Sequence, residues 1–198
     1  MTGVLVARIL RELERYYDAT AEDVASFVRP HEGPGREALL VREVDEVLEL
    51  QLLLPANVAG AGPGAWTDLS LDERCQLVEG VSHFLLLCER ARAGRSTTQL
   101  ELELQAEVDK WLVLSRGGRL PPEHDDALHD ALYGDAAFLH DEASIEGARY
   151  RLANRLGARF ARHLSESYAR KGRHRDMRRA LASFFRMSQE EKLRAASR

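Results

Sequence analysis

Apolar residues recur every three or four positions over most of the chain, which is the period of an amphipathic helix. This pattern predicts helices over residues 4–17, 70–92, 96–115, 121–133, 142–170 and 176–186. A shorter helix is expected from Thr20 to about Val28 and a last one after Ser188. Ser70, Ser96 and Ser188 each precede Glu or Gln by three residues, which is the spacing of a capping box at a helix start. We therefore expect a mainly α fold, a single-domain antiparallel bundle of six or seven helices.

The stretch 37–54 fits two patterns. Every second residue from Leu48 to Leu54 is leucine, as in a half-buried strand, and Leu39-Leu40-Val41 could form its partner strand. The apolar residues from Leu40 to Leu48 also share one face of a helix. We favour a small β-hairpin near residues 38–54 and keep a helix as the alternative.

Size and composition point to an ordinary globular chain. The 198 residues are 44% hydrophobic and 30% charged, values typical of a folded domain with its own core. We expect one domain over residues 1–198. Its parts would be N-terminal helices with a possible hairpin and loop over 1–69, a helical core over 70–170, and basic helices over 171–198.

The location is predicted from missing signals. The longest apolar run, from Phe84 to Cys88, is far too short to cross a membrane. The first residues lack the basic region of a signal peptide. The two cysteines, Cys75 and Cys88, fall in one predicted helix and could not form a disulfide with each other. These features predict a cytoplasmic protein without a membrane partner.

The formal net charge of −4 hides an asymmetry along the chain. Residues 149–198 contain 15 Lys and Arg against 4 Asp and Glu, and residues 1–148 contain 13 against 28. The predicted helix over 142–170 has small residues at Ala153, Gly157 and Ala161 on its apolar side, which would let another helix approach closely. A basic surface should lie on its other side and continue into the next segment. Its residues are Arg151, Arg155, Arg159, Arg162, Arg173, Arg175, Arg178 and Arg179.

No catalytic motif stands out, so the sequence predicts a non-catalytic interaction or scaffold protein that uses this basic surface. Arginine is suited to bidentate pairing with carboxylates. We therefore expect a protein partner, or self-association through acidic and basic complementarity. Nucleic-acid binding is an alternative, because arginine also contacts phosphates. It is less favoured, since the pI is about 6.0 and no aromatic residues are interleaved with the arginines.

A metal-dependent enzyme is the other alternative. Glu79 and His83 lie one turn apart in a predicted helix, and Glu107 and Glu146 lie in two others. Carboxylates and imidazole from several helices would suit a divalent metal such as Fe, Mn or Zn. The layout resembles that of ferritin-like di-metal carboxylate proteins. Those proteins use Glu-x-x-His, whereas this chain has Glu-x-x-x-His once. Because of this difference, we favour a protein without a cofactor and keep a divalent metal as the alternative.

Overall fold

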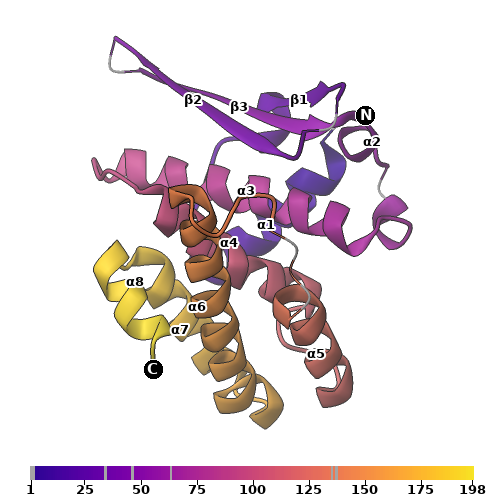
Figure 1. Ribbon diagram of the computed structural model, residues 1–198, viewed down its shortest axis with the longest axis vertical. Helices are drawn as coiled ribbons and strands as arrows, with labels where there is room; N and C mark the ends of the chain where they lie inside the picture. Colours follow the sequence, from indigo (N-terminus) through magenta and orange to yellow (C-terminus); the bar gives the residue numbers. More distant parts are fainter. Residues whose placement is uncertain (1–2, 34, 46, 63, 135, 137) are drawn as a thin grey trace. The chain divides into compact units, whose positions relative to one another are not determined.

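The computed structural model describes residues 3–33, 35–45, 47–62, 64–134, 136 and 138–198 (Figure 1). These residues form a mainly helical structure with a small mixed sheet of three strands. The chain divides into two compact units. Unit 1 contains residues 1–15 and 19–95, and unit 2 contains residues 16–18 and 96–198. The boundary after Arg95 lies inside the segment 70–170 that we expected to form one helical core.

Unit 1 combines helices with the sheet. Its elements are α1 (Val4–Tyr17), β1 (Val28–His31), β2 (Ala38–Val44), β3 (Val47–Pro55), α2 (Ala56–Ala59) and α3 (Leu71–Arg92), with the last residues of α1 assigned to unit 2. The strand order is β1-β3-β2, with β1 parallel and β2 antiparallel to β3. The β2–β3 pair confirms the hairpin that we favoured over a helix.

The prediction of a short helix from Thr20 to about Val28 is wrong. Only Val24–Phe27 forms a 3-10 turn, in which the side chain of Asp23 accepts a hydrogen bond from the backbone nitrogen of Ala25. The chain then becomes the strand β1, which contains Pro30. A residue that precedes proline is biased away from the helical conformation, so Arg29 favours the extended chain.

The core of unit 1 lies between the sheet and α3. Leu52 and Leu54 are fully buried, whereas Leu53 between them is only partly buried. The alternation predicted for this strand is therefore present. A Cβ atom at Gly80 of α3 would lie 2.7 Å from Cδ1 of Leu52. Glycine at this position lets the helix pack closely on the sheet.

Unit 2 is built from helices. They are α4 (Gln99–Leu114), α5 (Pro122–His129), α6 (Ile145–Ser167), α7 (His174–Arg186) and α8 (Gln189–Ala196). Helix α6 packs closely on α4 at Gly157. A Cβ atom added to this glycine would lie only 2.4 Å from Cβ of Glu107, so no larger residue fits there without a shift. The rings of Phe160 and Phe184 stack with centroids 4.1 Å apart and join α6 to α7. The close approach predicted for the small-residue side of α6 is thus confirmed at Gly157.

Two details of the predicted helices are wrong. The described residues contain eight α-helices rather than six or seven. One of them, α2, is a single turn and leaves no periodic pattern in a sequence. The capping boxes at Ser70 and Ser188 are present. The one expected at Ser96 is formed instead by Thr98 and Glu101, two residues later.

None of the helices in the described part of the chain combines the length and the low charge that a membrane span requires.

Candidate functional site

The charge asymmetry of the sequence lies largely within unit 2. Unit 1 contains 10 Lys and Arg against 15 Asp and Glu, and unit 2 contains 18 against 17. Within unit 2, residues 96–148 hold 3 basic and 12 acidic residues, and residues 149–198 hold 15 and 4. The acidic and basic stretches therefore fold into the same unit and nearly cancel.

Ion pairs that join α5 to α6 and to the 3-10 turn after it (Ala169–Lys171) account for part of this cancellation. The Asp126 carboxylate pairs with the guanidinium groups of Arg162 and Arg170. Hydrogen bonds from Arg170, and then from Arg162, lower the pKa of Asp126 below its ordinary value. Arg170 also reaches Asp125, with 3.4 Å between Nη2 and Oδ2. Two arginines of the basic stretch are thus neutralised inside the unit.

His129 extends this network. Its Nε2 lies 3.0 Å from the backbone oxygen of Ala158, which can only accept, so Nε2 donates. Its Nδ1 then accepts a hydrogen bond from Nη2 of Arg162 at 3.0 Å. Arg162 was predicted to bind a partner. Its guanidinium instead contacts two side chains of α5, those of Asp126 and His129.

Asp125 is a buried carboxylate that is not among the predicted site residues. It accepts hydrogen bonds from Nε1 of Trp111, at 2.9 Å, and from Oγ of Ser165. These donors, together with Arg170, satisfy a charge that would be costly to bury alone. Asp125 therefore ties α5 to both α4 and α6.

The other predicted arginines divide into two groups. Arg151 donates to the backbone oxygen atoms of His140 and Gly147 at 3.1 and 3.2 Å. Arg173 and Arg179 both pair with Asp176, with shortest N–O distances of 2.9 and 3.5 Å. The remaining four are exposed and have no hydrogen-bond or ion-pair partner among the described residues. They are Arg155, Arg159, Arg175 and Arg178.

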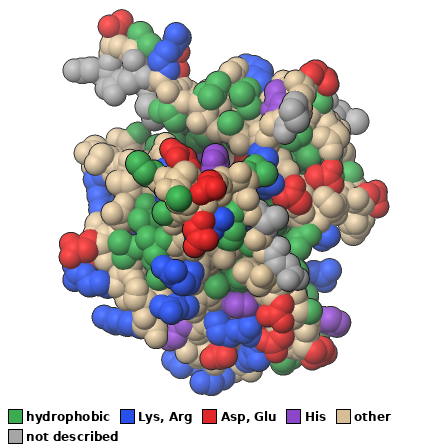
Figure 2. All heavy atoms as spheres, viewed as in Figure 1, with side chains coloured by type: hydrophobic (Ala, Val, Ile, Leu, Met, Phe, Trp, Pro, Cys, Tyr) green, Lys and Arg blue, Asp and Glu red, His purple; other side chains and the backbone are tan. Residues whose placement is uncertain are grey.

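Figure 2 shows where these charges gather on one face. Lys and Arg side chains lie over the lower part of the view, where Figure 1 places α6, α7 and α8, and Asp and Glu side chains lie beside them over α5. We refer to Arg155, Arg159, Arg175 and Arg178 as the open arginines. They are the part of the predicted basic surface that unit 2 leaves available.

A second polar network is enclosed in unit 2. The hydroxyl of Tyr17 donates to Asp109, and Nε2 of Gln105 lies 3.0 Å from both the Tyr17 hydroxyl and Oδ1 of Asp109. Nζ of Lys192 donates to Oε1 of Gln105 and lies 4.8 Å from the ring centroid of Phe184. Burial, and then the charge of Asp109, raise the pKa of Tyr17 well above its ordinary value. All four polar side chains are fully buried, which makes the network structural.

The four predicted metal ligands are distributed over both units. Glu79 and His83 lie on α3 in unit 1, with Glu79 buried and His83 half-buried. Glu107 lies on α4 with its carboxylate 2.9 Å from Nζ of Lys110, and Glu146 is exposed in the first turn of α6. Glu146 precedes Gly157, the residue on which Glu107 packs, by about 16 Å along the helix axis. Glu107 of α4 therefore lies against the middle of α6, whereas Glu146 lies in the first turn of α6.

Within either unit taken alone, the described residues hold no group of three His, Cys, Asp or Glu side chains arranged to bind a metal ion. Among the described residues, neither unit supplies a metal site by itself, and the metal-dependent enzyme remains a prediction from the sequence.

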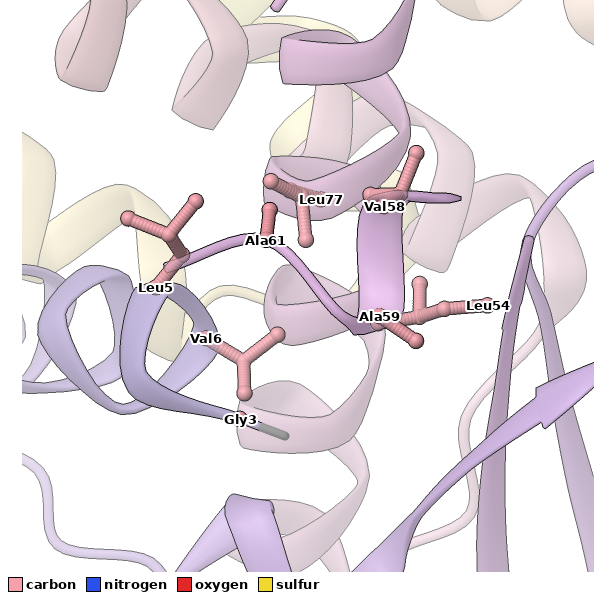
Figure 3. Close-up of a pocket in the computed structure, with 8 residues that line it drawn as sticks. All are labelled: Gly3, Leu5, Val6, Leu54, Val58, Ala59, Ala61 and Leu77. Carbon is pink, nitrogen blue, oxygen red and sulfur yellow. The ribbon is translucent and has the colours of Figure 1, made fainter. Parts of the chain in front are cut away.

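Apolar residues of unit 1 line a narrow hollow that has no room for a water molecule (Figure 3). Its lining residues come from α1, β3, α2 and α3 and the adjacent loops. They are Gly3, Leu5, Val6, Leu54, Val58, Ala59, Ala61 and Leu77. No side chain in this lining can transfer a proton or act as a nucleophile. The hollow therefore offers no catalytic chemistry.

No protein-family model, curated protein or solved structure matches this chain.

Proposed function

We propose that this chain is a non-catalytic interaction protein that binds an acidic surface of a partner protein through the outer faces of α6 and α7. The observation that carries this proposal is the presence of the open arginines. Arg162, Arg173 and Arg179 in the same stretch are paired with carboxylates, yet Arg155 and Arg159 on α6 and Arg175 and Arg178 on α7 are not.

Unpaired, exposed guanidinium groups suit a carboxylate partner. Each can form two parallel hydrogen bonds with one carboxylate, which adds orientation to the charge attraction. Such contacts raise the rate of association and select the partner by charge.

Nucleic acid is the less favoured ligand for the same surface. Exposed Glu166 lies on α6 and partly buried Asp176 lies at the start of α7, so a phosphate backbone would meet carboxylates there. The neighbouring aromatic rings of Phe160, Phe184 and Phe185 are buried and cannot stack on bases. Unit 2 as a whole carries one excess positive charge, far less than the basic balance of a dedicated nucleic-acid domain.

A polyglutamate peptide with a fluorescent label tests this proposal by anisotropy. We expect the wild type to bind it at about 50 mM salt, and the variant with all four open arginines changed to Gln to bind at least about tenfold more weakly. The matched control changes four exposed arginines elsewhere to Gln, at Arg11, Arg119, Arg194 and Arg198. It loses the same charge and should keep most of the affinity.

Two results would overturn the proposal. One is an equal loss of binding in both variants, which would show that only net charge matters. The other is tighter binding of a single-stranded RNA than of the peptide, with a steep salt dependence, which would identify a nucleic-acid surface.

A further inference from the structure

Two large aliphatic side chains of unit 2 are largely exposed to solvent. Leu139 is 76% exposed and Ile145 is 81% exposed, whereas the other exposed large hydrophobic residues in the described part of the chain reach at most 50%. The two lie within one short segment at the start of α6. A group of exposed apolar side chains of this kind marks an interaction surface.

This segment is held in place by the fold. The ring of His140 stacks on Tyr150 with centroids 5.4 Å apart, and its backbone oxygen accepts the bond from Arg151. Ser144 caps α6, with its Oγ 2.9 Å from the backbone nitrogen of Gly147. A Cβ atom at Gly147 would lie 1.8 Å from the backbone oxygen of Asp141. The turn is therefore built around a close contact, and it presents Leu139 and Ile145 to solvent.

The apolar end continues along one side of α6. At 3.6 residues per turn, Ile145, exposed Ala148 and half-buried Leu152 follow one another on the same side of the helix. Arg155 and Arg159 come next on this side, about 15 and 21 Å beyond Ile145 along the axis. We call this side of α6, from Ile145 to Arg159, the outer strip. Its first half is apolar and its second half is basic.

Three exposed carboxylates lie close in sequence to the apolar end. Asp141, Glu142 and Glu146 are all exposed and form no ion pair among the described residues. At its margins the apolar end thus has three exposed carboxylates and one half-buried arginine, Arg149, whose guanidinium lies 5.3 Å from the ring centroid of Tyr150. The excess is negative, which is the charge that the open arginines Arg155 and Arg159 would select. The two complementary halves cannot meet within one straight helix.

We propose that the partner of the outer strip is a second copy of this chain, with the two α6 helices antiparallel around a two-fold axis. Leu139, Ile145 and the flanking carboxylates of one copy would then lie against Arg155 and Arg159 of the other. A two-fold arrangement makes this contact twice and closes the assembly as a dimer. The inference rests on the proposed function, because it uses two of the same arginines and names the acidic surface that they bind.

A strip one helix wide forms a small interface, so the dimer is weak and reversible. We expect a dissociation constant on the order of micromolar at low salt, which rises as salt screens the exposed charges. Sedimentation velocity of the full chain at several concentrations measures this equilibrium directly.

Reciprocal charge reversal tests the contact itself. E142K/E146K reverses the acidic end, R155E/R159E reverses the basic end, and each variant alone should sediment as a monomer. An equimolar mixture of the two should dimerise again, because each reversed end then faces its opposite. L139S/I145S should weaken the dimer at least about tenfold without losing charge, and circular dichroism checks that every variant keeps its helices.

The inference is overturned if the wild type stays monomeric at low salt, if the mixture does not restore the dimer, or if L139S/I145S dimerises as well as the wild type. Binding of the polyglutamate peptide separates this failure from that of the proposed function. A monomeric wild type that still binds the peptide through its open arginines would have an acidic partner other than itself.

Discussion

Gln105 joins a buried cation to a buried anion in unit 2. Its amide oxygen accepts a hydrogen bond from Lys192, and its amide nitrogen lies 3.0 Å from the carboxylate of Asp109. A carboxylate at this position could accept a hydrogen bond from Lys192 but could not donate one to Asp109. An aliphatic side chain could neither accept nor donate. Because Lys192 and Asp109 are fully buried, the chemistry of residue 105 decides whether both ends of the network keep these bonds.

The substitution Gln105→Leu should lower the free energy of unfolding by about 2–4 kcal/mol, since it removes bonds from two buried charges. Urea denaturation measures this loss. Gln99→Leu is the control, because Gln99 is exposed on the same helix and its replacement should change stability by no more than about 0.5 kcal/mol. Equal effects of the two substitutions would show that the network contributes little.

This network could not be predicted from the sequence. Tyr17 is 92 residues from Asp109, and Lys192 is 87 residues from Gln105, so only the folded chain brings them together. In the sequence, Leu104, Val108 and Trp111 recur at helical spacing, and Gln105 and Asp109 each follow one of them. This pattern alone would place both polar residues beside the buried face of the helix. The structure buries both, because Tyr17 and Lys192 supply hydrogen-bond partners there.

At the scale of elements, the sequence predicted those helices and strands whose pattern lies within a few neighbouring residues. The leucine alternation predicted β3, and the Ser70 and Ser188 boxes marked the starts of α3 and α8. The strand β1 was missed because it has only four residues and pairs with β3 across a long stretch of chain. The start of α4 was placed too early because Ser96 and Thr98 both have a suitable residue three positions later, at Gln99 and Glu101.

The two possible starts of α4 make separable predictions. Thr98→Ala should destabilise the protein by about 1 kcal/mol, because the threonine side chain accepts a hydrogen bond from the Glu101 backbone nitrogen at 3.1 Å. Ser96→Ala should have almost no effect, since Ser96 lies outside the helix. Thermal unfolding of both variants measures the difference. A larger effect at Ser96 would contradict the observed start.

At the scale of the whole molecule, charge is organised by the folded units. Residues 1–148 and 149–198 differ strongly in charge, yet the boundary between the units follows Arg95, and unit 2 holds both signs. The sequence predicted the basic surface but could not separate its paired arginines from its open ones. That distinction depends on the fold, which places α5 with Asp126 beside Arg162 and Arg170.

The substitution Asp126→Asn should therefore remove one ion pair each from Arg162 and Arg170, so that more of their positive charge is available on the basic surface. Arg162 would keep its bond to His129, and Arg170 its contact with Asp125. The lowered pKa of Asp126 means that its ion pairs stabilise the fold above the ordinary carboxyl pKa, and that this contribution disappears as the pH falls through the lowered value. The variant should be less stable than the wild type at pH 7 and equally stable once Asp126 is protonated. It should also bind the polyglutamate peptide more tightly.

Asp130→Asn is the matched control for Asp126→Asn. It removes the same charge from a residue whose carboxylate lies 4.0 Å from Arg162 and is 79% exposed. It should therefore change the stability and the affinity for the peptide less than Asp126→Asn does. Urea denaturation across the acid range and peptide anisotropy measure the two effects. If both variants gain the same affinity, the gain comes from net charge. If Asp126→Asn alone gains, the internal ion pairs determine how much of the basic surface is available to a partner.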